Sequence, residues 1–523
     1  MIIDFREMEA GTALQADICI VGAGAAGITL AMELAGTGAD ILLVESGGRE
    51  FDAAIQQLYA GPNIGHHYFD NDLSRLRYFG GTTNHWGGRC IAMDALDFRK
   101  RDWVPHSGWP ITRAELEPFY QRAAAFCAMG RAETDPAHWV ERGVRLDAFD
   151  PAKLETVTWQ VSPLIPFTSA YAEPLEAART VRVLLHANVT NIQAADNAAS
   201  VDRLDIATLD GKAGTVRARA YVLATGALEV PRLMLASNTV EASGLGNRHD
   251  RVGRFFMEHP HAFTTVLLAA DEADVLARYG YHEFNGHEMQ IGLALGHALQ
   301  EREGVLNASA SLDFRINPES GILALRDIYR AVREGQLPVA LGDKLYAVVA
   351  DIDGVVGQAY RRVRGEKLGG PTVPGFILRT EQAPNPDSRV TLIQERDALG
   401  MPRLALDWRL NAQDKRTLEV MSGALAEEVG RLGLGRVRVD DWVAEGAEEW
   451  GPDMEGGFHH MGTTRMHADP RQGVVDADSR VHGYANLYVA GPSVFTTGGY
   501  ANPTLTAVAL TMRLADRLAA DFA

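Results

Sequence analysis

A strand–turn–helix–strand unit near the N-terminus constrains the fold of this chain more than any other segment. It reads ADICIVGAGAAGITLAMELAGTGADILLVESGG, in which the continuous apolar run 18–21 is typical of a buried parallel strand. The glycine-rich run 22–27 leads into a helical pattern that should end near Gly36 or Gly38, and a second buried strand ends in Glu45. We therefore predict an α/β protein that begins with a doubly wound Rossmann-type domain.

The glycines of this turn have the spacing of a dinucleotide-binding motif. Gly22, Gly24 and Gly27 fit G-x-G-x-x-G. The first permits the tight turn, the second lets the backbone approach a pyrophosphate, and the third lets the helix pack closely on the strand. Glu45 follows Gly27 by 18 residues, near the position of an acid that binds a ribose hydroxyl. The pattern predicts a bound dinucleotide, but the motif alone does not separate NAD from FAD.

Length and charge limit the class of protein and its partners. A chain of 523 residues is too long for one simple core, so we expect two closely joined domains. The formal net charge of −18 predicts a surface that repels phosphate backbones, which makes nucleic acid a poor partner. The same charge disfavours strongly anionic substrates, unless a local basic pocket overrides the global field.

The cysteine pattern and the absence of apolar segments bear on the compartment. Cys19, Cys90 and Cys127 are odd in number and form no CxxC pair, which favours a reducing compartment over a disulfide framework. The N-terminus shows no secretory signal, and no run of about 18 apolar residues predicts a membrane span. We expect a cytoplasmic protein.

Other segments carry local signals. The run 77–90, RYFGGTTNHWGGRC, has too many glycines for a helix and is interpreted as an ordered loop. Thr112 is a plausible N-cap with Glu115 three residues later. The segment 380–394, TEQAPNPDSRVTLIQ, resembles a turn between two strands, and a long final helix should start at about Pro503.

Five stretches, in chain order, match one enzyme family. They read GAGAAG…LLVESG, GGTTNHWGG, ATGALEVPRLML, HHMGTTRM and RVHGYANLYVAGPSVFTTGGYANPTLTAVAL. Over nearly its whole length the chain resembles the glucose–methanol–choline (GMC) oxidoreductases, a family of FAD-dependent enzymes that oxidise alcohols. The GGTTNHWGG loop, together with EQAPNPDSRV, looks closest to the bacterial sugar-oxidising branch, which includes pyranose oxidases.

The resemblance implies a division of the chain into two domains. A discontinuous FAD-binding domain of the doubly wound Rossmann type should comprise 1–110, 180–260 and 450–523. A substrate-binding domain with an antiparallel sheet should comprise 111–179 and 261–449. The overall class is α/β, with α+β character overall.

The resemblance also implies FAD and the residues that hold it. The expected cofactor-binding residues are Gly22, Gly24, Ala25, Ala26, Gly27, Glu45, Ser46, Gly81, Thr82, Asn84, His85, Gly87, Gly88, Val189, Ala224, Gly226, Gly491, Asn502, Pro503 and Thr504. Some sugar-oxidising relatives attach the flavin covalently through a histidine at the position of His85. Because Gly87 stands where those relatives carry a threonine, we favour dissociable FAD and keep the covalent link as the alternative.

Two residues in separate C-terminal segments should carry the chemistry. By the family pattern, His459 precedes the G-x-x-R-M element, and Asn502 lies 43 residues further on in the last glycine-rich turn. A neutral imidazole can take the hydroxyl proton while a hydride leaves carbon for the flavin N5, and an amide can orient the oxygen. We assign His459 as base and Asn502 as orienting donor. His460 should point to the opposite face and bond within the core, because alternate side chains of an extended segment diverge.

The resemblance predicts oxidation of an alcohol to a carbonyl, above all a secondary hydroxyl of a pyranose sugar or glycoside. The alternatives are a non-sugar alcohol, aromatic or aliphatic, an NAD-dependent dehydrogenase, and a flavin-binding protein without alcohol chemistry. Either dioxygen or a quinone could reoxidise the flavin.

A metal site is the remaining alternative, and we predict none. HEFNGHEM places His282 and His287 five residues apart, whereas zincin helices need H-E-x-x-H. A second set lacks a recognised ligand spacing; it consists of His459, His460, His467 and Asp469.

Overall fold

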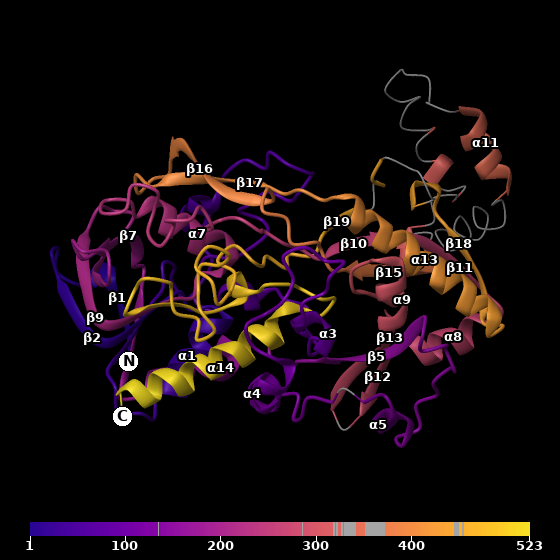
Figure 1. Cartoon of the computed structure of the whole chain (residues 1–523), viewed down its shortest axis with the longest axis horizontal. Coiled ribbons are helices and arrows are strands. Elements are labelled where there is room, and N and C mark those ends of the chain that lie inside the picture. The colour runs from indigo at the N-terminus through magenta and orange to yellow at the C-terminus, as the bar shows by residue number, and fades with distance from the viewer. Residues whose placement is uncertain are drawn as a thin grey trace, which may run out of the picture.

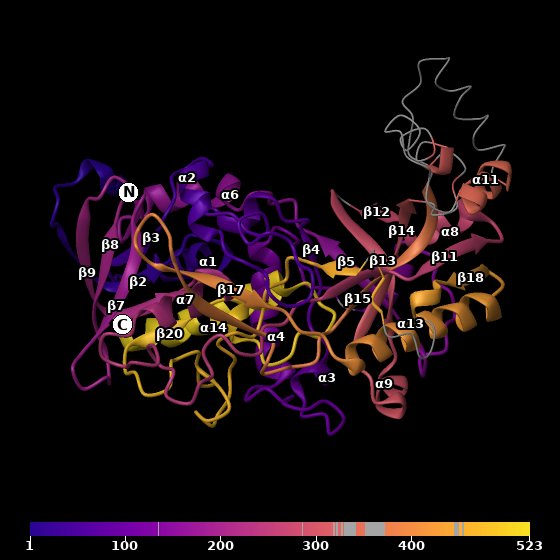
Figure 2. The same ribbon diagram turned by 90° about the horizontal axis from the view of Figure 1, so that it is seen from above.

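The computed structural model describes most of the chain in two sheet-centred halves. Outside the described residues lie 134, 285, 317–319, 321–322, 326–327, 329–340, 351–371, 444–448, 452–453 and 523. The predicted assignment of those residues to one or the other domain therefore lies outside what the structure describes. Figures 1 and 2 show the two sheets toward opposite ends of the long axis, with the C-terminal helix running back into the first half.

The first half contains an eight-stranded sheet built around the predicted N-terminal unit. Its path is β1 (Ile2–Asp4), β6 (Val181–Leu185), β3 (Ile41–Val44), β2 (Ala13–Val21), β9 (Ala213–Leu223), β8 (Val201–Ala207) and β7 (Asn188–Ala194), and β20 (Leu487–Val489) also pairs with β9. Along this path the first five strands, β1, β6, β3, β2 and β9, are parallel, and β20 pairs parallel with β9. Strands β8 and β7 extend the sheet with antiparallel pairing. This arrangement confirms the predicted fold class, and residues 18–21 and 41–44 are buried as continuous apolar strands should be.

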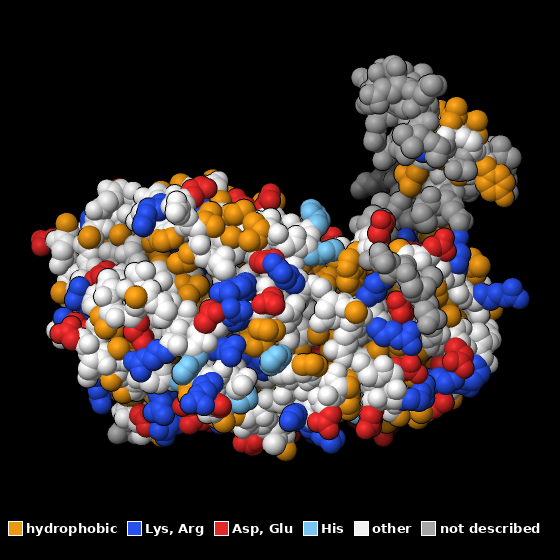
Figure 3. Space-filling view, turned by 45° about the horizontal axis from the view of Figure 1, so that its top comes forward, with side chains coloured by type: hydrophobic (Ala, Val, Ile, Leu, Met, Phe, Trp, Pro, Cys, Tyr) orange, Lys and Arg blue, Asp and Glu red, His pale blue; other side chains and the backbone are white. Residues whose placement is uncertain are grey.

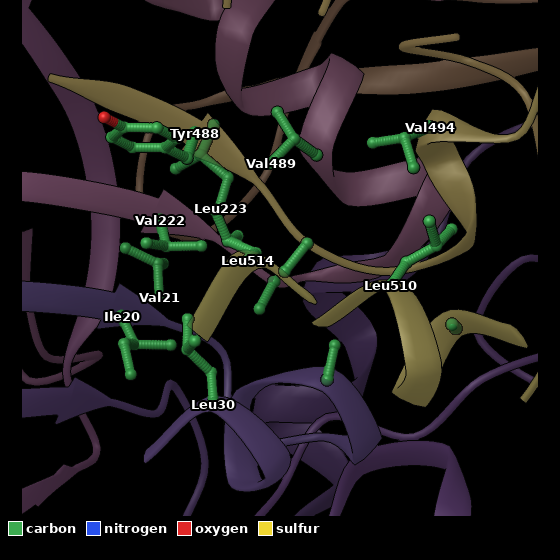
Figure 4. Packing of buried hydrophobic residues seen from close by; sticks show 14 of the residues in the cluster. Ile20, Val21, Leu30, Val222, Leu223, Tyr488, Val489, Val494, Leu510 and Leu514 are labelled. Carbon is green, nitrogen blue, oxygen red and sulfur yellow. The ribbon is translucent and has the colours of Figure 1, made fainter. Parts of the chain in front are cut away.

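Helices cover the faces of this sheet and complete its core. α1 (Ala25–Leu34) packs on α14 (Pro503–Phe522), and α7 (Gly226–Ala236) follows β9. Figure 4 shows apolar side chains from β2, β9, β20, α1 and α14 packed together. Helix α14 begins at Pro503 as predicted, where a proline at the first helical position loses no hydrogen bond.

The second half contains an antiparallel sheet. Its path is β19 (Met454–Gly456), β10 (Pro260–Phe263), β15 (Thr372–Thr380), β14 (Ala308–Ile316), β13 (His287–Leu295), β5 (Leu154–Val161) and β4 (Arg89–Cys90), with β12 (Tyr281–Phe284) paired to β13. Helix α13 (Ala412–Arg431) packs against β5, β14 and β15. Two smaller sheets pair β11 (Thr265–Ala269) with β18 (Gly435–Val439) and β16 (Arg389–Arg396) with β17 (Pro402–Asp407).

The remaining described helices are short or peripheral. They are α2 (Ala53–Gln56), α3 (Ala95–Phe98), α4 (Arg113–Phe126), α5 (Ala137–Val140), α6 (Thr168–Ala177), α8 (Glu272–Tyr279), α9 (His297–Glu303) and α11 (Leu341–Ala350). Helix α4 starts with the predicted capping box: Thr112 Oγ1 accepts from Glu115 N, and the Glu115 carboxylate accepts from Thr112 N at 2.7 Å. None of the described helices is both long and apolar enough to cross a bilayer.

Some segments lie elsewhere than the predicted domain ranges suggest. α4 and α6 fall within 111–179, yet α4 packs on α14 and α6 on α1 and β6. β16 lies within 261–449 but packs on α7, as Figure 1 shows. The loop 77–90 is more structured than its glycines indicated, since it contains a 3-10 helix, η3 (Gly81–Asn84), and then β4. Strand β4 joins the antiparallel sheet and so links the two halves directly beside the cavity described next.

Candidate active site

A cavity of about 460 Å³ connects the glycine turn of the first half with the antiparallel sheet of the second. It is lined by the turn after β2, by the start of α14, by the loop 457–460 and by the start of α7. Every site residue predicted from the sequence lines this cavity except Gly27 and Asn84. The structure thus brings together residues separated by several hundred positions in the chain.

The glycine turn is shaped to admit a phosphate-bearing ligand. Gly22 has φ +99°, and a Cβ there would lie 2.8 Å from the carbonyl oxygen of Ala224. A Cβ on Gly27 would lie 1.8 Å from the carbonyl oxygen of Gly22, so this glycine serves helix–strand packing and not the cavity wall. At Gly24, a Cβ would meet only the Cα of Gly81, at 4.0 Å, and would fill cavity space that the turn leaves free. The N-terminus of α1 faces this space with its partial positive charge.

Glu45 is fixed at the edge of the cavity. Its carboxylate accepts hydrogen bonds from the backbone N–H groups of Ala23 and Gly47, at 2.8 and 2.9 Å. The Ser46 hydroxyl donates to the same carboxylate at 3.2 Å. A carboxylate has about four lone-pair positions, so one remains for a ribose hydroxyl. The free space at Gly24 and the acid at Glu45 fit the adenosine and pyrophosphate end of FAD.

The loop after η3 forms the wall between the two halves. The Asn84 amide donates to the carbonyl oxygens of Phe79 and Gly81, at 3.1 and 2.9 Å, so Asn84 shapes the loop instead of facing the cavity. His85 does line the cavity, and burial lowers the pKa of its imidazole below 6.5. Whether FAD is attached to His85 or dissociable stays a prediction.

Histidines from two distant segments meet at the other end of the cavity. His459 Nε2 lies 3.2 Å from Asn502 Nδ2, and His459 Nδ1 lies 2.8 Å from His259 Nδ1. The ring of His261 packs against His459 with 5.5 Å between centroids. The predicted pair, His459 and Asn502, is therefore in contact. His259 and His261 belong to the strand region about 200 residues earlier, and no sequence motif indicated them.

His460 points away from this pair. Its Nε2 lies 2.8 Å from the hydroxyl of Tyr68, and its ring packs on Phe256. Tyr68 in turn donates a short hydrogen bond to Glu258. His460 is thus held by a side-chain network within the core.

Glu258 fixes the segment that carries His459. Its fully buried carboxylate accepts from the backbone N–H groups of Gly457, His459 and His259, at 3.0, 2.9 and 2.9 Å. Burial is the largest influence on its pKa and raises it to about 7, against the opposing effect of Tyr68 and the three N–H donors. One buried acid therefore positions both the base segment and its histidine neighbour.

The imidazoles of this cluster are neutral at physiological pH. Burial lowers the pKa of His459 well below 6.5, and the nearby His259 and His261 lower it further. Burial also lowers the pKa of His259 to about 4 and that of His460 to about 3. No group of three or more metal-ligating side chains occurs within the described part of the chain. Because these imidazoles are neutral, each can accept a proton.

Comparison with known proteins agrees with this geometry. Residues 17–242 match the family described as FAD dependent oxidoreductase, and residues 384–511 match the family described as GMC oxidoreductase. The 6'''-hydroxyparomomycin C oxidase of Streptomyces lividus is 25% identical over 98% of this chain and 94% of its own. The fructose dehydrogenase large subunit of Gluconobacter japonicus is 23% identical over 97% of this chain and 98% of its own.

Solved structures support the fold. Pyridoxine 4-oxidase from Mesorbium loti has a TM-score of 0.56 at 16% identity and covers 96% of this chain and 98% of its own. The fold and the cavity thus define an FAD-dependent oxidoreductase. The family matches and the full-length relatives then give the narrower statement: the chain is similar to the GMC oxidoreductases, whose family model matches its C-terminal part.

Proposed function

We propose that the protein oxidises a hydroxyl of a pyranose sugar or glycoside to a carbonyl, above all a secondary hydroxyl. The observation that carries this proposal is the contact between His459 and Asn502, both facing the cavity that also contains the glycine turn. FAD, when bound, supplies the hydride acceptor. The fit of the turn and of Glu45 to a dinucleotide supports that cofactor.

The hydrogen bonds of His459 set its protonation. Because the Asn502 amide nitrogen can only donate, Nε2 of His459 presents its lone pair to it. The ring proton of His459 is therefore on Nδ1, where it is donated to Nδ1 of His259. This tautomer leaves Nε2 as the atom that accepts the proton of a substrate hydroxyl.

Asn502 orients the oxygen that loses this proton. Its Nδ2 donates to His459 in the free protein, and its Oδ1 is buried without a partner. A substrate oxygen placed between the two side chains would accept from Nδ2 while its proton goes to Nε2 of His459. Such a pair holds the alkoxide-like oxygen in one orientation as hydride leaves the carbon.

The names of full-length relatives support a sugar-like substrate. Two of them are an oxidase of 6'''-hydroxyparomomycin C and a fructose dehydrogenase, and shorter matches at 35% and 34% identity are named C-glycoside 3-oxidase. A non-sugar alcohol is the second candidate, since 2-methyl-1,2-propanediol dehydrogenase of Mycolicibacterium austroafricanum is 22% identical over 97% of this chain.

Anaerobic reduction of the flavin tests the proposal. The purified holoprotein should show the blue-region absorbance bands of oxidised flavin, and mixing with pyranoses, glycosides or aliphatic alcohols should bleach them. Faster bleaching by sugars supports the proposal, and faster bleaching by simple alcohols supports the second candidate. Failure of every alcohol to bleach the flavin would refute both. Reoxidation by dioxygen or by a quinone then identifies the acceptor, and acid precipitation tells covalent from dissociable FAD.

A further inference from the structure

Two arginines lie at the end of the cavity where the histidines meet. Arg89 is on β4 and Arg379 is on β15, and both line the cavity. The positive charge of Arg379 acts on His459, and the charges of both arginines act on His261. Arg379 therefore lies near His459 and both arginines lie near His261, on the sheet opposite the glycine turn.

Neither arginine has an acidic partner among the residues that the structure describes. Arg379 Nη1 donates to Ser311 Oγ at 2.8 Å, which orients its guanidinium without neutralising it. Arg89 stacks on the ring of Trp159 at 4.6 Å, and its Nε and Nη2 are buried without any hydrogen-bond partner. The Tyr281 hydroxyl is a hydrogen-bond partner of the Arg89 side chain, and Asp313 attracts both guanidinium groups but makes an ion pair with neither.

Several other buried arginines of this protein pair with acids, whereas buried Arg465 donates to the backbone carbonyl of His106. Arg101 makes two hydrogen bonds to Glu381, at 2.8 and 2.6 Å, with both side chains fully buried. Arg232 donates to Asp397 at 2.6 Å. A buried and unpaired charge is unfavourable because it loses its solvation without gaining a counter-charge. Unlike Arg465, which lies outside the cavity lining, Arg89 and Arg379 are arginines without an acidic partner that line the cavity.

The unpaired atoms of Arg89 have the geometry that a carboxylate binds. Nε and Nη2 lie on one edge of the planar guanidinium, and this edge can make two parallel hydrogen bonds to two oxygens of one anion. Arg379 adds a second positive charge, and burial together with repulsion by Arg89 lowers its pKa to about 9. An anion between them would relieve that repulsion.

The acids nearest the histidines do not provide this anion. Glu258 is already occupied by three backbone N–H donors and by Tyr68. Glu381, whose charge acts on His259, is paired with Arg101. The histidines themselves are neutral at physiological pH. Although the chain as a whole has a net charge of −18, this end of the cavity is locally positive.

We propose that the alcohol oxidised by this protein carries an anionic group, a carboxylate or a phosphate, which Arg89 and Arg379 bind while the hydroxyl meets His459 and Asn502. The inference rests on the proposed oxidation and narrows its substrate class to acidic sugars and related hydroxy acids. A uronic acid has this chemistry, because its pyranose ring bears hydroxyl groups and one carboxylate.

A matched set of sugars tests the anion. Glucose, glucuronate, glucosamine and glucose 6-phosphate share one ring and differ in charge. The compared quantity is the rate constant of anaerobic flavin reduction divided by the dissociation constant of the sugar. For glucuronate or glucose 6-phosphate it should exceed the value for glucose at least 30-fold. The better of these two sugars identifies the bound anionic group as a carboxylate or a phosphate. Equal rates, or a preference for glucosamine, would overturn the inference while leaving the oxidation of sugars intact.

Variants separate recognition from chemistry. Arg379→Gln and Arg89→Gln should each reduce the preference for the anionic sugar over glucose by about 30-fold or more, since truncating one partner of a buried charge pair costs about 2–5 kcal/mol. Arg379→Lys should retain part of the preference. Arg217→Gln, which alters an exposed pair with Asp202, is the matched control and should change nothing. An unchanged preference in both glutamine variants would contradict the assignment.

A binding measurement keeps the test decisive if no sugar is oxidised. Calorimetric titration of the oxidised holoprotein should then show glucuronate or glucose 6-phosphate binding more tightly than glucose, and Arg379→Gln should abolish the difference. That result would refute the proposed oxidation and support the anion site. Equal binding of all four sugars would refute the anion site on its own.

Discussion

Removal of the His459 imidazole is the most direct test of the chemistry. His459→Ala deletes the atom that accepts the hydroxyl proton, and positioned general bases contribute about 10²–10⁴-fold to rate. This corresponds to about 3–5 kcal/mol of transition-state stabilisation. The change also leaves Asn502 Nδ2 and His259 Nδ1 without a partner, at a cost to folding of about 1–3 kcal/mol each. The variant should still bind FAD, because the imidazole is not part of the glycine turn.

The assay is anaerobic stopped-flow reduction of the flavin at pH 8, where both His459 and Glu258 have lost their protons. The parent should reduce at least 100-fold faster than His459→Ala, while both show the same flavin absorbance per protein. His138→Ala, a histidine beside Glu133 and outside the cavity, should behave as the parent. A rate in His459→Ala within a factor of ten of the parent's would remove His459 from the role of base. The pKa of His459 is lowered well below 6.5, so the parent's rate should fall when the pH drops through that pKa and the imidazole becomes protonated. This decrease at low pH should be absent from His459→Ala.

Three further outcomes follow from buried contacts. Gly27→Ala should abolish FAD binding, measured as flavin absorbance per protein, because the new Cβ would overlap the backbone carbonyl of Gly22. The control Gly423→Ala, at a helical position with open space around it, should retain FAD. Normal FAD content in Gly27→Ala would be inconsistent with this packing. Arg101→Met should lower the free energy of unfolding, measured by urea titration, by about 3–5 kcal/mol, because it leaves the buried Glu381 carboxylate without its charged partner. A loss under about 1 kcal/mol would contradict a buried bidentate pair. Glu258→Gln should remove the inflection near pH 7 from the pH profile of flavin reduction, since burial raises the pKa of this carboxyl to about 7 and its ionised form holds the loop; an inflection that persists would belong to another group.

Several features could be predicted because they depend on residues close in the chain. The glycine turn, the Thr112–Glu115 capping box and the start of the last helix at Pro503 are set by local backbone geometry and by adjacent side chains. The turn between two strands that was predicted at 380–394 also depends on nearby residues, and it lies between the end of β15 at Thr380 and the start of β16 at Arg389. The contact between His459 and Asn502 was accessible only through resemblance, because nothing in their spacing brings them together.

Other features had no signal in the sequence. Arg89 was part of a glycine-rich loop motif and Arg379 part of an ordinary strand, and their common environment appears only when β4 and β15 join one sheet. Tyr68, Glu258 and His261 likewise act through partners more than 100 residues away. Whether the charge of a buried side chain is neutralised depends on the side chains around it, and the order of the strands in the sheet determines which side chains those are.

The sequence by itself determined the class of protein. It supplied a dinucleotide-binding turn, a C-terminal helix that begins with a proline, and a base and an amide of the types that alcohol oxidation needs. Those properties reside in backbone conformations and chemical groups that each segment carries alone. The tertiary structure alone decided the protonation and the electrostatics of the site. Hydrogen-bond direction, loss of solvent and the distance between like charges arise only when remote strands pack around one cavity.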